Sequence, residues 1–174
     1  CRTEHPLEEG IKRKLALFCN VDFRNVIEAA DAPDFSIYQV PLMLKKEGLD
    51  TVVLKTLGLE AHPMVGSRWE EIVRRIKAPK TELKVAVVGK YMGTQDAYKS
   101  VFEALAHAAI AHDARLEIVK IDAEELPKRG AAAVLQGMDA ILVPGGFGNR
   151  GIEGKILAAQ YARENKVPYF GLCL

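Results

Sequence analysis

Two strand-like segments near the end of the chain, each followed by a distinctive loop, constrain the fold more than any other feature. Residues 138–143 are apolar except for Asp139 and run into the glycine-rich loop 144–151, and residues 167–171 run into Cys173. The intervening residues 152–165 have apolar side chains at helical spacing, and the pattern ends before Pro168. Such a unit crosses over with a right hand, so it predicts both loops at the carboxyl edge of one parallel sheet.

The glycine loop admits three interpretations. Gly146-x-Gly148-x-x-Gly151 matches a dinucleotide fingerprint, but that fingerprint expects an acidic residue about 20 positions later, where this chain has Cys173. A tight turn with positive φ explains one or two glycines, but not four in seven residues. The favoured interpretation is an oxyanion loop, in which free backbone N–H groups face a nucleophile.

Cys173 is the candidate nucleophile. A nucleophile on a sharp strand-to-helix turn needs small neighbours, and Gly171 lies two residues before it. A helix starting after Cys173 would present its positive end to the sulfur and favour the thiolate. A lone cysteine that closes an apolar strand is more often a small buried hydrophobe. The glycine loop one crossover upstream favours acyl transfer instead.

These residues carry a family resemblance. The segments PGGFGNRGIEGK (144–155) and PYFGLCL (168–174) resemble the glutamine amidotransferase domain of the CTP synthases. The segments VVGKYMGTQDAYKSVFEAL (87–105) and KRKLALFCNV (12–21) resemble the same family in the same order. The glycine loop and Cys173 alone indicate a class I glutamine amidotransferase, and the two upstream segments narrow the resemblance to CTP synthase.

The resemblance implies a ligase of pyrimidine nucleotide biosynthesis with two catalytic domains. A synthetase (amidoligase) domain uses ATP and Mg²⁺ to phosphorylate the 4-oxygen of UTP, and ammonia then displaces the phosphate. A glutaminase domain releases that ammonia from glutamine, GTP activates this step, and the family forms homotetramers. This segment alone is expected to be inactive, because the family's other catalytic groups have no counterpart in it. The alternative is a non-catalytic amidotransferase-like binding or regulatory module.

The resemblance also assigns roles to individual residues. Cys173 matches the nucleophile that forms a glutamyl thioester, Gly146 and Leu174 match the donors of the oxyanion site, and Phe147 matches a residue that packs on the substrate. For the synthetase domain, the matching residues are Lys14 for UTP or CTP and Ala30, Asp31 and Ala32 for ATP. The family often has lysine where this chain has Ala30. Lys99 lies in a segment associated with coupling of the two domains.

The pattern along the chain predicts an α/β protein with two parts. Residues 1–58 are assigned to the end of the synthetase domain, residues 59–81 to a linker with a short helix, and residues 82–174 to the first half of an open, parallel-sheet, three-layer α/β/α amidotransferase domain. The junction is placed at the polar, proline-containing residues 78–82. Within the first part, the continuous apolar run 15–21 predicts a doubly buried strand with Cys19 in the core.

Composition excludes several other classes of function. The 174 residues carry a net charge of +1, which gives no case for nucleic acid or an anionic membrane as partner. The three cysteines contain no CxxC pair, so neither a disulfide framework nor a zinc site is predicted. The chain shows no signal peptide and no apolar run of about 18 residues, so a cytoplasmic location is expected. Lys90 follows a glycine but fails the phosphate-loop pattern and is predicted to be solvated. We expect the chain to be a segment of a longer protein.

Overall fold

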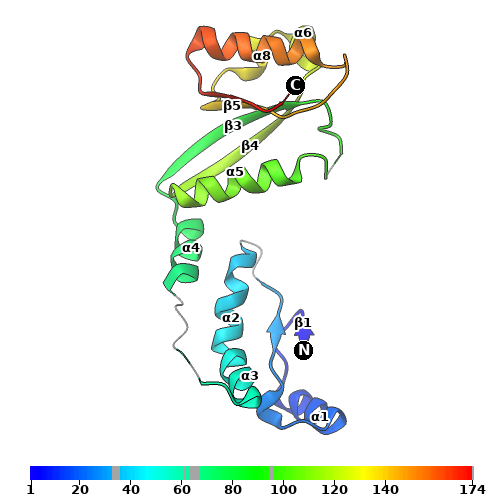
Figure 1. Cartoon of the computed structure of the whole chain (residues 1–174), viewed down its shortest axis with the longest axis vertical. Helices are drawn as coiled ribbons and strands as arrows, with labels where there is room; N and C mark the ends of the chain where they lie inside the picture. The colour runs from blue at the N-terminus through cyan, green and yellow to red at the C-terminus, as the bar shows by residue number, and fades with distance from the viewer. Residues whose placement is uncertain (33–35, 61, 63–66, 95, 174) are drawn as a thin grey trace. The chain divides into compact units, whose positions relative to one another are not determined.

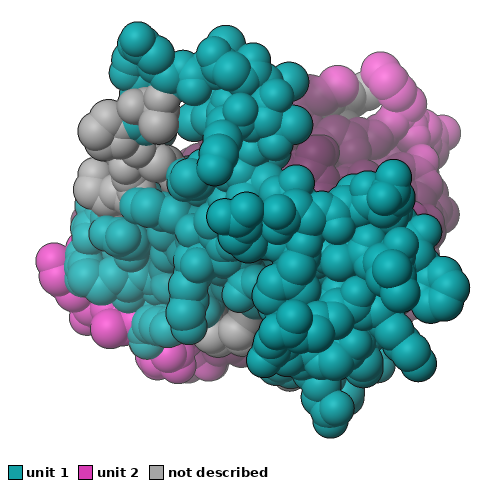
Figure 2. Space-filling view, turned by 90° about the horizontal axis from the view of Figure 1, so that it is seen from below, with its two compact units in different colours: residues 1–77 teal, residues 78–174 magenta. Residues whose placement is uncertain are grey.

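The computed structural model describes residues 1–32, 36–60, 62, 67–94 and 96–173. The chain divides into two units, Cys1–Lys77 and Ala78–Leu174, which are coloured separately in Figure 2. The division falls beside the polar residues 78–82 at which the sequence places a domain junction.

The first unit is mostly helical and contains one short parallel strand pair, in which Arg2 is in register with Ala29. Pro41 lies in the first turn of a helix, as its fixed φ favours, and Gly48 and Gly58 have positive φ at either end of the next. The elements are β1 (Arg2–Thr3), α1 (Glu9–Cys19), the 3₁₀ turn η1 (Phe23–Asn25), β2 (Ala29–Ala30), the 3₁₀ turn η2 (Ile37–Gln39), α2 (Val40–Lys46), α3 (Leu49–Leu57) and α4 (Ser67–Lys77).

Helix α1 corrects the prediction of a buried strand at residues 15–21. A continuous apolar run does not distinguish a strand from a helix, and here the preceding polar residues begin the helix. Glu9 and Arg13 form an ion pair one turn apart, and Asn20 ends the helix with a left-handed φ of 51°. Ala16 is the buried residue of α1, whereas Cys19 is exposed, so its assignment to the core is wrong.

The second unit is a four-stranded parallel sheet with the order β4-β3-β5-β6, as the alternation of strand and helix predicts. Helix α5 covers one face, and α8 with α6 covers the other (Figure 1). This confirms the predicted three-layer α/β architecture. The elements are β3 (Thr81–Gly89), α5 (Lys99–Ala111), β4 (Ala114–Asp122), α6 (Glu125–Arg129), α7 (Ala131–Leu135), β5 (Ala140–Val143), α8 (Ile152–Asn165) and β6 (Tyr169–Gly171).

Two apolar layers enclose the central strands, because alternate side chains of a strand point to opposite faces. On β3, Ala86 and Val88 belong to the cluster that packs under α6, α7 and α8. Val85 and Val87 belong to the smaller cluster on the α5 face. Both faces of the sheet are therefore buried, as a parallel sheet requires.

Helix α8 has the predicted bounds but buries a different face. Leu157 and Tyr161 pack against the core, whereas Ile156 is 53% exposed. The fully packed positions are Gly154, Ala158 and Ala162, together with Lys155. Small residues at this spacing let α8 approach the sheet closely.

Candidate functional site

The carboxyl ends of β5 and β6 bring the glycine loop against Cys173. The two strands pair with Val143 in register with Gly171, and the N–H of Leu172 donates to the Val143 carbonyl at 2.9 Å. A methyl group added at Gly145 would lie 3.0 Å from the Cβ of Cys173 and 3.6 Å from its Sγ. The loop and the thiol thus form one site at the carboxyl edge of the sheet.

The backbone of Cys173 has the geometry of a sharp turn. Its φ is 60°, in the left-handed region that residues with a Cβ rarely adopt. The residue lies just beyond β6, and its thiol is free and exposed. An exposed side chain on a strained turn after a parallel strand is what a nucleophile elbow requires.

Lys90 anchors the glycine loop from beneath. It follows β3 directly and is only 3% exposed, so the prediction of a solvated lysine is wrong. Its Nζ donates to the carbonyl oxygens of Phe147 at 2.8 Å and Gly148 at 2.5 Å. Its own N–H donates to the hydroxyl of buried Tyr98 at 3.2 Å. Lys90 is therefore fixed by its backbone N–H at one end and bound to the glycine loop by its ammonium group at the other.

Lys155 anchors the same loop from α8. It is 9% exposed, and its Nζ donates to the Pro144 carbonyl at 3.1 Å. Burial lowers the pKa of the Lys155 ammonium, the charge of Lys90 lowers it further, and Cys173 acts in the opposite direction. The two lysines therefore lie close enough for their charges to interact beneath the loop.

Arg150 ties the far end of the loop to the sheet. Its Nη2 donates to the Lys90 carbonyl at 2.6 Å, and its Nη1 pairs with Glu124 at 3.6 Å. The guanidinium also lies over the ring of Tyr91, 5.5 Å from the centroid. Phe147, at the crest of the loop, is 77% exposed and presents its ring to solvent.

The predicted synthetase residues lie in the first unit. Lys14 is exposed on α1, and Ala30 ends β2. Asp31 accepts two hydrogen bonds from Arg2, at 2.9 and 3.2 Å, and this hydrogen bonding and the charge of Arg2 lower the pKa of its carboxyl. Ala32 follows directly and is half-buried.

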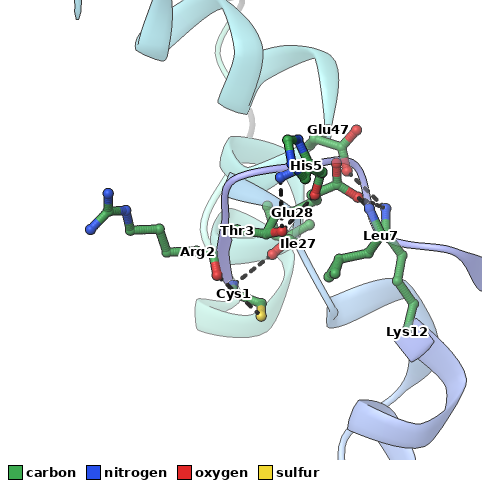
Figure 3. A network of polar contacts seen from close by, with 9 residues as sticks. All are labelled: Cys1, Arg2, Thr3, His5, Leu7, Lys12, Ile27, Glu28 and Glu47. Atoms are coloured by element: carbon green, nitrogen blue, oxygen red, sulfur yellow. Dashed lines mark hydrogen bonds and ion pairs between the residues drawn. The ribbon is translucent and has the colours of Figure 1, made fainter. Parts of the chain in front are cut away.

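A polar network joins α1 to the residues that lead into β2 (Figure 3). The Nζ of Lys12 lies 3.0 Å from Glu28 and 3.4 Å from Glu47, and Glu28 also accepts from the N–H of Leu7 at 3.0 Å. The N-terminal amine of Cys1 donates to the Ile27 carbonyl at 2.8 Å. The helix that carries Lys14 is thereby fixed to the strand that carries Ala30.

Lys90, Arg150 and Lys155 contribute to the site in ways that were not predicted from the sequence. A signal existed for Lys155, since it lies three residues before Ala158 on the face with the small residues. Lys90 gave no comparable signal. Lys99 is exposed at the start of α5. The predicted oxyanion donor Leu174 lies outside the described residues.

Within the described ranges, no three His, Cys, Asp or Glu side chains are grouped closely enough to hold a metal ion. None of the helices in that part of the chain is long and apolar enough to cross a membrane.

Two family models match the chain, one in each unit. Residues 1–59 match the model described as CTP synthase N-terminus, and residues 94–174 match the model of class-I glutamine amidotransferase.

Curated relatives match along the whole chain. It is 53% identical over 174 residues to a CTP synthase of Desulfitobacterium hafniense and 56% identical over 173 residues to one of Carboxydothermus hydrogenoformans. These alignments cover 100% and 99% of this chain and 32% of each relative, so the chain spans about a third of their length. A solved glutaminase domain of Trypanosoma brucei CTPS with bound acivicin is 48% identical, with a TM-score of 0.47, covering 51% of this chain and 35% of that one.

Proposed function

The chain belongs to the CTP synthase family, and we propose that it is the segment of a glutamine-hydrolysing CTP synthase in which the synthetase domain ends and the amidotransferase domain begins. The complete enzyme would aminate UTP to CTP with ATP, using ammonia taken from glutamine. The observation that carries this proposal is the position of Cys173, at a φ of 60° and in contact with the glycine loop.

The proposed reaction of the second unit is amide hydrolysis through a thioester. The sulfur of Cys173 attacks the side-chain amide carbon of glutamine, the C–N bond breaks, and the nitrogen leaves as ammonia after receiving a proton. Water then attacks the thioester carbon, which releases glutamate and restores the thiol. The N–H groups of Gly146 and Leu174 are proposed to stabilise the oxyanion of each tetrahedral intermediate. The proton carrier is assigned to the family's histidine and glutamate, which the resemblance places beyond this segment.

The first unit is proposed to contribute to nucleotide binding. Lys14 would contact UTP or CTP, and Ala30, Asp31 and Ala32 would contact ATP, through their backbone where the side chain is a methyl group. Binding of Mg²⁺ is assigned mainly to residues outside this segment, on the basis of the family alone. GTP activation, a homotetramer and a cytoplasmic location are proposed for the complete enzyme on the basis of the family alone.

The test is CTP formation by the complete enzyme with glutamine and, separately, with ammonium chloride. Cys173→Ala should abolish the glutamine-dependent reaction and leave the ammonium-dependent one, because ammonia enters after the step that needs the thiol. Lys14→Ala should impair both, because the weakened UTP site is shared.

The outcomes separate the proposal from its alternative. If Cys173→Ala remains folded and keeps glutamine-dependent activity, or loses both activities, Cys173 is not the glutaminase nucleophile. If the unmodified complete protein binds glutamine but releases no ammonia, the non-catalytic regulatory module is the correct interpretation.

A further inference from the structure

The two buried lysines beneath the glycine loop have no role in the chemistry described above. We infer that Lys90 and Lys155 are positioning residues that fix the orientation of the oxyanion loop, and this inference rests on the proposed glutaminase function. Together they bind three carbonyl oxygens of the loop, those of Pro144, Phe147 and Gly148.

The bonds to carbonyls determine where the N–H groups point. In a trans peptide the carbonyl and the following N–H point in opposite directions. With the Pro144 carbonyl held by Lys155, the N–H of Gly145 faces away from that lysine. With the carbonyl of Phe147 held by Lys90, the N–H of Gly148 likewise faces away from Lys90.

The proposed oxyanion donor lies between these two anchors. The peptide that joins Gly145 to Gly146 has glycine on both sides, so its plane has the greatest freedom to rotate. The anchored Pro144–Gly145 peptide immediately before it and the anchored Phe147–Gly148 peptide, two peptides further on, restrict that rotation. A catalytic donor stabilises the transition state only if its direction is set before the charge develops, so the restriction bears directly on rate.

The contacts around Gly146 support the same arrangement. A Cβ added there would lie 3.5 Å from Cδ of Lys90 and 3.6 Å from Nζ of Lys155, so both side chains lie directly against this residue. Burying an ammonium group costs free energy unless it is hydrogen-bonded, and charged donors form the stronger bonds to carbonyls. Two such groups against one short loop hold it more firmly than neutral side chains would.

The test uses Lys90→Met and Lys155→Met in the complete enzyme, since methionine keeps an unbranched apolar stem of similar length and removes the ammonium. The matched control is Lys128→Met, whose side chain is 65% exposed on α6. For each variant we would measure kcat and KM for glutamine, CTP formation with ammonium chloride, the rate of Cys173 alkylation by iodoacetamide, and inhibition by the aldehyde analogue of glutamine.

We expect kcat for glutamine to fall about ten- to a hundred-fold in both variants, as a misplaced catalytic group causes, with KM changed by less than about three-fold. Inhibition by the aldehyde should weaken in parallel, because its adduct with the thiol places an oxygen in the oxyanion site. Ammonium-dependent synthesis should stay near the unmodified value, since it does not use the oxyanion site. Alkylation of Cys173 does not use that site either and should fall much less than kcat, although Lys155→Met removes a positive charge that interacts with Cys173. Lys128→Met should leave all four measurements unchanged.

The inference is overturned if both lysine variants hydrolyse glutamine at the unmodified rate. It is equally overturned if alkylation and aldehyde inhibition fall to the same extent, because the lysines would then support the thiol or the whole domain. Failure of the proposed function is recognised separately, by Cys173→Ala retaining glutamine-dependent activity whatever the lysine variants do.

Discussion

Among the single residues of the glycine loop, Gly145 is the glycine whose added Cβ would meet Cys173. An added Cβ at Gly145 would lie 3.0 Å from the Cβ of Cys173, whereas one at Gly146 would meet its neighbours at 3.5 Å or more, which is ordinary contact. Gly145→Ala should therefore push Cys173 out of position and lower glutamine-dependent CTP formation, with ammonium-dependent formation retained.

The control for Gly145→Ala is Gly93→Ala, because an added Cβ at Gly93 would meet nothing within 4 Å. Steady-state rates with the two nitrogen sources provide the measurement. Unchanged glutamine kinetics in Gly145→Ala would show that the loop and Cys173 are not in contact in the working enzyme.

Some residues of the site are marked by the sequence around them, and others are brought into it only by tertiary packing. The glycines and Cys173 stand at the ends of apolar runs, so the crossover rule alone brings them to one edge. Lys90 and Lys155 become buried only where β3, β5 and α8 meet, and charged side chains are rarely buried. A prediction from sequence therefore favours solvent for Lys90, and only the small residues on the same face of α8 indicate that Lys155 is buried.

At the scale of elements, α8 depends on the absence of a side chain at Gly154. A Cβ there would lie 1.7 Å from the carbonyl oxygen of Ala123, where β4 leads into α6. In a helix interior with free space, replacing glycine by alanine stabilises the helix by roughly 0.5–1 kcal/mol. Whether Gly154→Ala stabilises or destabilises the protein therefore tests the close contact with Ala123. Gly154→Ala should instead destabilise the second unit by at least the roughly 1–3 kcal/mol typical of overpacking.

Amide hydrogen exchange in α8 and β4 measures this effect without involving the first unit. Protection should fall in Gly154→Ala and stay unchanged in Gly93→Ala. Increased protection from exchange in Gly154→Ala would mean that the space between α8 and Ala123 can hold the added methyl group.

Helix α4 provides a test of pH dependence. Hydrogen bonds from Arg74 and Arg75, at 2.7 and 2.8 Å, lower the pKa of Glu71 from 4.5 to about 2. Because the folded value lies below the unfolded one, the stabilisation is fully present above 4.5 and is lost as the pH falls through about 2. An NMR titration of the Glu71 carboxyl should show a midpoint near 2, and a midpoint at the ordinary value would contradict the ion pairs.

The elements also show where pattern reasoning succeeds and where it fails. Helical periodicity predicted the bounds of α8, and the alternation of apolar runs with helical patterns along the chain predicted the parallel strands. The run 15–21 is short and mostly apolar, so it fits either element, and the ion pair of Glu9 with Arg13 lies in the polar residues that precede it. Residues 49–57 form the helix α3, whose ends are marked in the sequence by two glycines, both with positive φ.

At the scale of the whole molecule, each unit exposes large apolar side chains that a monomer in water would normally cover. In the first unit, Leu17 and Phe18 on α1 are 77% and 82% exposed. In the second, Tyr169 and Phe170 on the edge strand β6 are 43% and 60% exposed. An exposed apolar edge strand can pair with another copy of itself.

We therefore expect the isolated 174-residue chain to self-associate. Light scattering after size exclusion, over a range of protein concentrations, should give a mass that rises above 19.1 kDa. Phe18→Gln and Phe170→Gln each remove one exposed ring, and the variant that restores the lower mass identifies the surface responsible. Glu103→Gln, on an exposed position of α5, leaves the apolar surface unchanged and serves as the control. A monodisperse monomer with one cooperative thermal transition would contradict this prediction. It would show that the chain folds and stays monomeric with both apolar surfaces exposed to water.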